Sequence, residues 1–376
     1  MSGRINEEPG LPTSSRQRPS DTDHGPQSTV HGSTIQIVDP LSDPSWDDRV
    51  LSLPSYSFFH SSGWARVLRD TYGYKPVYFV LSDDNGLRSL LPIMEVYSLL
   101  TGRRGSALPF SDDCDGDHVD PEEFAALFRA AQLYGKERGW QTLECRGGVD
   151  SVPDATPSTS FYGHRLDLKK SHHELFSGFY SSVRRAIRKA ERSGLRIEKS
   201  SDRNAILDYY ALHCLTRRRH GLPPQPIRMF ENIHRDILSQ GNGFVILGRK
   251  GLHAVAGAVF LHFGTHAIFK FGASVKETLH SRPNNLIMWE GIKRLADLGL
   301  PTLHFGRTSF LNKGLRNFKR GWGTTESRID YLKYDLKLDR YLQSPDRTQG
   351  WHNALFRLMP IPLARLVGSM LYKHVA

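Results

Sequence analysis

The same order of structural elements is predicted twice along this chain of 376 residues. In the first half, the apolar runs 76–81 and 87–96 flank Asn85-Gly86, a dipeptide typical of a tight hairpin turn. In the second half, the runs 244–248 and 254–263 flank Lys250-Gly251 in the same way. A helical pattern and a short apolar strand follow each hairpin, at 121–138 and 140–146, and again at 283–298 and 302–305. This repetition predicts an internal duplication and an α+β fold with mixed sheets.

The composition along the chain predicts four segments. Residues 1–33 are rich in Ser, Pro, Gly, Asp and Arg and contain few large apolar side chains, so we expect a disordered tail. We expect a first domain over 34–170 and a second over 171–345, which opens with mostly helical sequence. Residues 346–376 read as an amphipathic helical segment, and two interpretations stay open for it: a helix packed on the domain, or a helix lying in a membrane interface.

The charge and the cysteine content narrow the classes of partner and site. The net charge of +11 favours an anionic partner, such as nucleic acid, a phosphorylated substrate or anionic lipid. The three cysteines are scattered and form no Cys-x-x-Cys pair, and no His-Glu-x-x-His occurs, so we expect neither a disulfide framework nor a metal site. We find no signal peptide and no long apolar run, and we therefore expect a cytoplasmic protein, with peripheral contact at the inner face of the membrane as an option.

The strongest chemical signal lies in residues 304–324. A predicted buried strand ends at Gly306-Arg307, and a short basic helix containing Lys319 follows. A strand that turns into a helix can direct backbone N–H groups and cations at one spot, which suits a phosphate or a developing oxyanion. The alternative is a solvated basic face on a surface helix.

A second basic run occupies the predicted helix 181–193. Arg184, Arg188 and Arg192 recur at every fourth position and therefore share one helical face. This face predicts a clamp for phosphates of tRNA or of a nucleotide-linked or lipid-linked acceptor. Here too, a solvated face is the alternative.

Taken in order, these segments resemble the Fem-type (FemAB-like, FemABX) aminoacyl and acyl transferases. The resemblance covers roughly residues 55–336 and is most detailed in the last motif. The residues of this chain that match it are Phe305, Gly306, Arg307, Gly314, Leu315, Phe318, Lys319, Trp322 and Gly323. The resemblance implies two tandem GNAT-like (acyl-CoA N-acyltransferase-like) domains and transfer of an acyl or aminoacyl group.

The resemblance also implies roles for individual residues. We expect Lys319, Phe318 and Arg307 to be catalytic, with no metal. The helix after Trp64 and the loop 107–113 correspond to acceptor-binding regions of the family. The residues expected to bind substrate are Arg66, Arg69, Phe110, Asp112, Asp113, Arg184, Arg188 and Arg316. Asp330, Glu290 and His304 are available as general bases, but we assign none.

We therefore expect transfer to an amine or hydroxyl of a phosphorylated cell-envelope precursor, in a peptidoglycan or exopolysaccharide pathway. The donor stays open between aminoacyl-tRNA and acyl-CoA. Residues 281–285 lack the glycine-rich pyrophosphate loop of simple GNAT enzymes, which disfavours acetyl-CoA. The alternative function is a catalytically idle GNAT-like module that docks on membrane or nucleic acid.

Overall fold

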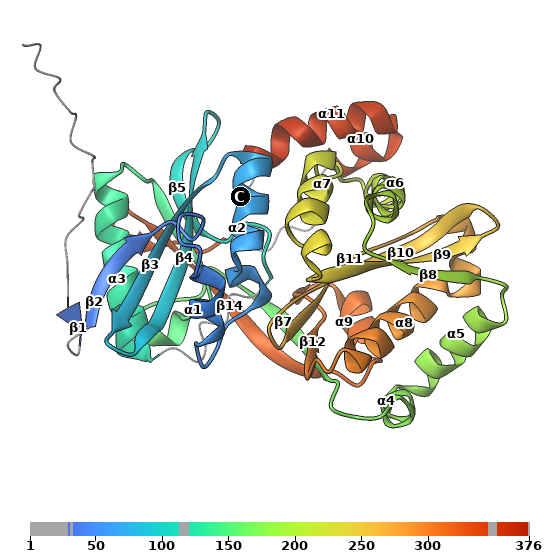
Figure 1. Ribbon diagram of the computed structural model, residues 1–376. Coiled ribbons are helices and arrows are strands. Elements are labelled where there is room, and N and C mark those ends of the chain that lie inside the picture. The colour runs from blue at the N-terminus through green and yellow to red at the C-terminus, as the bar shows by residue number, and fades with distance from the viewer. Residues whose placement is uncertain (1–28, 31–32, 113–119, 345–351, 375–376) are drawn as a thin grey trace, which may run out of the picture.

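The structure is a computed structural model that describes residues 29–30, 33–112, 120–344 and 352–374 (Figure 1). The elements of the first half are β1 (Thr29–Val30), β2 (Ser33–Val38), α1 (Trp46–Leu51), the 3-10 turn η1 (Phe58–His60), α2 (Ser62–Tyr72), β3 (Lys75–Asp83), β4 (Gly86–Ser98), β5 (Gly102–Ala107), α3 (Pro121–Glu137) and β6 (Thr142–Arg146). The remaining elements are β7 (Thr159–Asp167), α4 (His172–Gly178), α5 (Ser181–Glu191), β8 (Arg196–Ser200), α6 (Arg203–Arg219), α7 (Ile227–Asp236), β9 (Gly243–Lys250), β10 (His253–Phe263), β11 (His266–Ser274), α8 (Pro283–Asp297), β12 (Thr302–His304), β13 (Thr308–Ser309), α9 (Lys313–Arg320), β14 (Thr325–Asp335), β15 (Arg340–Tyr341), α10 (His352–Leu358) and α11 (Ile361–Leu371).

The strands in the described part of the chain form one continuous sheet. Its order is β1-β2-β3-β4-β5-β6-β14-β7-β12-β11-β10-β9-β8, with β13 beside β7 and β15 beside β14. The pairs β5–β6 and β11–β12 are parallel, and the other pairs are antiparallel. The expected α+β fold with mixed pairing is therefore confirmed, and the two halves meet within a single sheet.

The two strands at the centre of this sheet are exchanged between the halves. β7 follows the first half in sequence but pairs with β12, where Leu166 lies opposite Leu303. β14 comes near the end of the second half but pairs with β6, where Leu332 lies opposite Cys145. β7 and β14 also pair with each other. Each half therefore depends on a strand from the other. The domain boundary expected at residue 170 would assign β7 to the first domain, whereas β7 pairs with β12 of the second half.

Helices cover both faces of the sheet (Figure 1). α3 packs on one face of the first half, and α8 with α5 packs on one face of the second half. On the opposite face, α2 packs against α7, and Trp64 and Phe230 from these two helices belong to one cluster of buried side chains. This shared core holds the halves together beside the sheet, because buried apolar area is lost if they separate.

The predicted hairpins, helices and short strands lie within a few residues of their observed positions. The strands β1, β5, β7, β8, β13, β14 and β15 were not predicted. The tail expected over 1–33 overlaps the sheet, since Thr29–Val30 forms β1 and Ser33 begins β2. Residues 1–28 and 345–351 lie outside the described residues.

The C-terminal segment forms two short helices that contact α6. α10 ends before Pro360, and α11 begins after it. In the part of the chain that the structure describes, no helix is both long and apolar enough to cross a bilayer.

Candidate active site

The site forms where two neighbouring strands diverge. β11 pairs with β12 only from His266 to Ile268, and β11 then continues alongside β10 to Ser274. The chain after β12 turns away and follows β7, because the Phe305 N–H donates to the His164 carbonyl over 2.9 Å. Gly306 makes this turn with a φ of 74°, a left-handed conformation that glycine adopts without strain. The strands therefore part next to the Gly306-Arg307 dipeptide.

Lys319 reaches this turn from α9. Its side chain is only 3% exposed, and its Nζ donates to the Gly306 carbonyl over 2.8 Å and the Arg307 carbonyl over 3.0 Å. Burial lowers the pKa of Lys319 to about 8, since the nearby charge of Asp112 offsets burial only in part. Lys319 is thus a buried lysine whose pKa lies close to neutral pH, and it is not a solvated surface lysine.

A buried ion pair joins the two halves at the same place. Lys270 of β11 donates from Nζ to the Asp112 carboxylate over 3.1 Å and to the Phe110 carbonyl over 2.5 Å. Burial alone would raise the pKa of Asp112, but the charges of Lys270 and Arg307 outweigh it and hold this pKa well below its usual range. Asp112 therefore stays a carboxylate at neutral pH. The Phe110 backbone has a φ of 63°, so the loop that carries Asp112 is strained.

Arg307 extends the cluster of charges toward β14. It donates to the Tyr331 hydroxyl over 2.6 Å, and this hydroxyl donates to the Asp112 carbonyl over 2.9 Å. The buried Arg146 guanidinium lies 5.2 Å from the centre of the Tyr331 ring. We call this set the seam cluster, and its members are Asp112, Arg146, Lys270, Arg307, Lys319 and Tyr331. It contains four cations and one carboxylate, and the Glu144 carboxylate lies 3.6 Å from Arg146. Cations still outnumber carboxylates, so this environment favours an added negative charge.

An open pocket lies against the diverging part of β11, and we name it the Phe318 pocket. Its empty volume is about 830 Å³. Phe269 lines it, whereas the next residue, Lys270, lies on the opposite face, where its Nζ is 4.8 Å from the centre of the Phe59 ring. The remaining lining residues come from α6, β10, β11, α8 and α9: Thr216, Arg219, His220, Gly257, Ala258, Gly272, Ala273, Ser274, Asn284, Ile287, Met288, Leu315 and Phe318.

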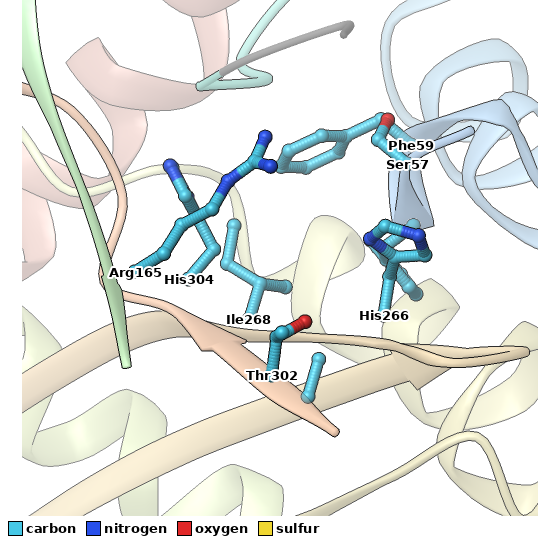
Figure 2. Close-up of a pocket in the computed structure, with 9 residues that line it drawn as sticks. Ser57, Phe59, Arg165, His266, Ile268, Thr302 and His304 are labelled. Carbon is cyan, nitrogen blue, oxygen red and sulfur yellow. The ribbon is translucent and has the colours of Figure 1, made fainter. Parts of the chain in front are cut away.

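A smaller pocket of about 380 Å³ lies on the other face, between η1 and the strands β7, β11 and β12. We name it the Arg165 pocket. Figure 2 shows Arg165 extending from β7 toward the Phe59 ring, with His304 of β12 beside it. Thr302 of the same strand also lines the pocket. His304 also accepts the Gly306 N–H at Nδ1 over 3.1 Å, so this pocket adjoins the same turn as Lys319.

Of the residues expected to bind substrate, Asp112 and Phe110 lie beside the expected catalytic residues. Arg66 lies apart from them, in a polar pocket with an empty volume of about 800 Å³ that we name the Arg66 pocket. Its guanidinium is half-buried and has no hydrogen bond or ion pair to any described residue. Arg69 is exposed and pairs with Asp70 over 2.8 Å.

The remaining expected residues lie on the side of α5 and α9. Arg184 donates to the Ser177 carbonyl, and the exposed Arg188 lies 5.6 Å from the centre of the Phe176 ring. Arg316 forms a two-point ion pair with Glu326, at 2.8 Å and 2.6 Å. Asp113 lies outside the described residues.

Sequence reasoning missed Lys270, Arg146, Tyr331 and His164. A lysine between Phe269 and Phe271 in a buried strand is a signal that could have revealed Lys270, because such a charge needs a partner.

His164 is fully buried, and neither ring nitrogen has a hydrogen-bond partner among the described residues. Burial, together with the charge of Lys319, lowers the pKa of His164 to about 4, so this imidazole is neutral.

The residues named as available bases have structural partners. Asp330 binds Arg328 over 2.8 Å, and Glu290 binds Lys199 over 2.9 Å and Lys293 over 2.7 Å. The described residues contain no group of three or more His, Cys, Asp or Glu side chains that could hold a metal ion.

Comparison with known proteins agrees with this geometry. Residues 177–320 match the acetyltransferase (GNAT) domain family, a range that includes β11, β12 and α9. Among solved structures, FemX aligns with a TM-score of 0.61 and 16% identity over 79% of this chain and 96% of its own. Residues 177–320 therefore resemble a GNAT acetyltransferase domain, and the chain as a whole has a fold similar to that of FemX.

Two further solved structures have a fold similar to that of this chain. A domain assigned to a lysylphosphatidylglycerol synthetase from Agrobacterium fabrum aligns with a TM-score of 0.52 and 16% identity, over 88% of this chain and 96% of its own. A tandem GNAT protein from the clavulanic acid biosynthesis pathway aligns with a TM-score of 0.51 and 9% identity, over 83% and 99%. No curated protein matches the sequence.

Proposed function

We propose that this protein is a Fem-like GNAT acyltransferase that moves an acyl or aminoacyl group onto an amine or hydroxyl of a phosphorylated cell-envelope precursor. The observation that carries the proposal is the excess of buried cations in the seam cluster, at the point where β11 and β12 diverge. Both the transition state of acyl transfer and the phosphates of such an acceptor are anionic, and buried cations stabilise them more strongly than solvated ones do. The similarity in fold to FemX and to a lysylphosphatidylglycerol synthetase domain supports an envelope acceptor.

In the proposed reaction, the acceptor lone pair attacks the donor carbonyl carbon and forms a tetrahedral oxyanion. The bond to the leaving oxygen or sulfur then breaks, and the acceptor proton passes to water or to the leaving group. Lys319 has three N–H donors and uses two of them on the Gly306 and Arg307 carbonyls. We assign the third to the oxyanion, and we assign Arg307 to the same developing charge.

We assign the acyl end of the donor to the Phe318 pocket. Its wall of small and apolar side chains suits a chain that lies close to the β11 backbone. α8 begins with Pro283, which has no N–H, directly after Arg282 in a left-handed conformation. Fewer backbone donors are therefore available for a pyrophosphate, but both aminoacyl-tRNA and acyl-CoA stay in the proposal.

We assign the anionic part of the acceptor to the Arg66 pocket and to the basic face of α5, through Arg184 and Arg188. Arg66 supports this assignment because a half-buried guanidinium without a partner is costly until an anion binds. Arg69 and Arg316 already form ion pairs with Asp70 and Glu326. They can bind the acceptor only if its anionic group replaces these carboxylates.

The test combines a cellular and a purified assay. Mass spectrometry of envelope glycans and muropeptides from a deletion strain identifies the product, and complementation with Lys319→Ala or Lys319→Met should fail to restore it. In the purified enzyme, Lys319→Ala should lower turnover about 10²–10³-fold. Lys319→Met keeps the volume of the side chain and separates lost charge from lost packing.

Lys313→Ala is the matched control, because Lys313 is an exposed lysine on the same helix. Turnover of folded Lys319→Met within about twofold of the wild type would overturn the proposal, since an uninvolved lysine is expected to be nearly neutral.

A further inference from the structure

The C-terminal helices expose a row of large apolar side chains. On α11, Leu363, Leu366 and Met370 follow the i, i+3, i+7 spacing of one helical face, and each is roughly half exposed. The opposite face is packed: Ala364 is buried, and a Cβ at Gly368 would come within 2.1 Å of the Pro224 carbonyl oxygen. The packed inner face of α11 therefore holds the helix in place, and the exposed row of apolar side chains has a fixed position on the outer surface.

The tip of the β4–β5 hairpin exposes a second apolar group. Leu99 is 83% exposed and Leu100 is 70% exposed, at the end of a hairpin that projects from the sheet (Figure 1). The Tyr97 side chain beside them is also exposed, with the Arg103 guanidinium over its ring. Adjacent leucines at a hairpin tip add nothing to the core, and their exposure opposes solubility.

Hydrogen bonds join these two surfaces. The Ser98 hydroxyl lies 2.9 Å from His374 Nδ1, and Arg104 donates to the His374 carbonyl over 3.0 Å. The hairpin tip and the C-terminal helices consequently lie at one end of the molecule, which is the top in Figure 1. We call this end the apical face. Its exposed apolar side chains are Tyr97, Leu99, Leu100, Leu355, Leu358, Leu363, Leu366, Met370 and Leu371.

The charges of the apical face are all positive. Arg357, Arg365 and Lys373 are exposed, and the sequence contains no Asp or Glu after Asp346. The hairpin segment 97–104 contains no acid either. Apolar side chains interspersed with cations are the composition of surfaces that enter the headgroup region of anionic bilayers.

We infer that the apical face docks on an anionic lipid surface, with the hairpin tip and the C-terminal helices inserted together. A nucleic-acid surface would not need nine exposed apolar side chains, and a second copy of this face would place like charges against one another. Docking would bring the enzyme to acceptors carried on lipid, and this biological purpose of docking rests on the proposed function. The docking itself needs neither donor nor acceptor.

The experiment is co-sedimentation of the full-length protein with vesicles of phosphatidylcholine, alone or mixed with phosphatidylglycerol. The wild type should bind the mixed vesicles and bind the neutral ones at least about tenfold more weakly. The triple variant Leu363→Ser/Leu366→Ser/Met370→Ser should lose about tenfold or more of the binding to mixed vesicles. Its control is Leu133→Ser/Leu252→Ser/Leu298→Ser, which changes three exposed leucines elsewhere and should bind like the wild type.

The charges and the hairpin are tested separately. Arg357→Gln/Lys373→Gln should weaken binding by about tenfold, and Lys250→Gln/Lys276→Gln should not. The chain has six tryptophans, so quenching is compared with that of the wild type. Brominated lipid should quench a larger share of the fluorescence in Leu99→Trp than in the wild type, and no larger share in Leu252→Trp.

Equal vesicle binding by the triple variant and its control would overturn the inference. So would a stable wild-type dimer that the triple variant dissociates, or binding to nucleic acid that competes with vesicles. Turnover of a soluble acceptor analogue is measured in parallel, so that loss of docking and failure of the proposed reaction are read separately.

Discussion

Lys319 and His164 are buried ionisable groups on facing elements, and burial shifts both toward their neutral forms. The ammonium of Lys319 retains hydrogen bonds to two carbonyls, but the imidazole of His164 has none among the described residues. Buried groups with shifted pKa values gather at functional sites, because chemistry needs charges that water would otherwise screen. We therefore make a separate prediction for each residue: Lys319 should affect the pH dependence of activity, and His164 should affect stability in acid.

The first prediction concerns the pH dependence of transfer. The pKa of Lys319 is about 8, so its ammonium is present below that pH and is lost above it. Lys319→Arg stays charged at every accessible pH, although its planar fork fits the two carbonyls poorly and should lower turnover. The ratio of wild-type to Lys319→Arg turnover, which cancels titration of the acceptor, should fall as pH rises through about 8. A constant ratio between about pH 7 and pH 9.5 would mean that the Lys319 charge takes no part.

The second prediction concerns acid stability. The pKa of His164 is about 4 in the folded protein and about 6.5 in an unfolded chain, so the unfolded state takes up the proton first as pH falls. Stability should therefore be lost between about pH 6.5 and pH 4, by up to about 3 kcal/mol from this residue. Urea unfolding should show a smaller loss over this range for His164→Gln. The exposed His253→Gln serves as control, and an unchanged loss in His164→Gln would contradict the assignment.

At the scale of elements, α5 presents a basic outer face while it packs on α8 through Val183 and Ile187. Arg188 is exposed on this helix, so its removal should leave the fold intact. We predict that Arg188→Ala weakens binding of tRNA or of a phosphorylated acceptor several-fold, and that the loss shrinks at high salt. Filter binding or calorimetry at two salt concentrations measures this. Lys250→Ala removes an exposed cation elsewhere, and an equal effect of the two changes would indicate non-specific charge.

Elements with strong local patterns could be predicted from the sequence, and the strands that join the halves could not. The hairpin around Asn85-Gly86 and the helix α8 have turn residues and regular apolar spacing. β7 and β14 mix apolar and charged residues, because they lie at the centre of the sheet and line a polar seam. Their partners are distant in sequence, and no local spacing encodes such a pairing.

In the candidate site too, residues that belong to one local motif could be predicted, and residues brought together only by the fold could not. Phe318, Lys319 and Arg307 belong to one motif and were found together, and Asp112 was found through its loop. Lys270, Arg146 and Tyr331 come from three different strands, and only the fold brings them to Asp112. The roles expected for Lys319, Phe318, Arg307, Phe110 and Asp112 stay predictions, as do those expected for Arg66, Arg69, Arg184, Arg188 and Arg316.

At the scale of the molecule, the exchange of β7 and β14 makes the halves interdependent. We predict that residues 1–170 and 171–376, produced separately, do not fold, because the first piece lacks β14 and the second lacks β7. Together in one chain they should unfold in a single thermal transition. Calorimetry and amide-proton dispersion in NMR spectra measure both properties. A cooperative transition in either isolated piece would contradict the prediction.

The same exchange bears on how substrates enter. Many two-lobed enzymes open and close about a hinge, but here two crossed strands and a shared core tie the lobes together. Separating them would break the backbone hydrogen bonds between β14 and β7, the two neighbouring strands at which the lobes meet in the sheet. We therefore expect the two lobes to keep one fixed arrangement, so that donor and acceptor bind without closure of the lobes. Small-angle scattering curves recorded with and without substrates should superimpose.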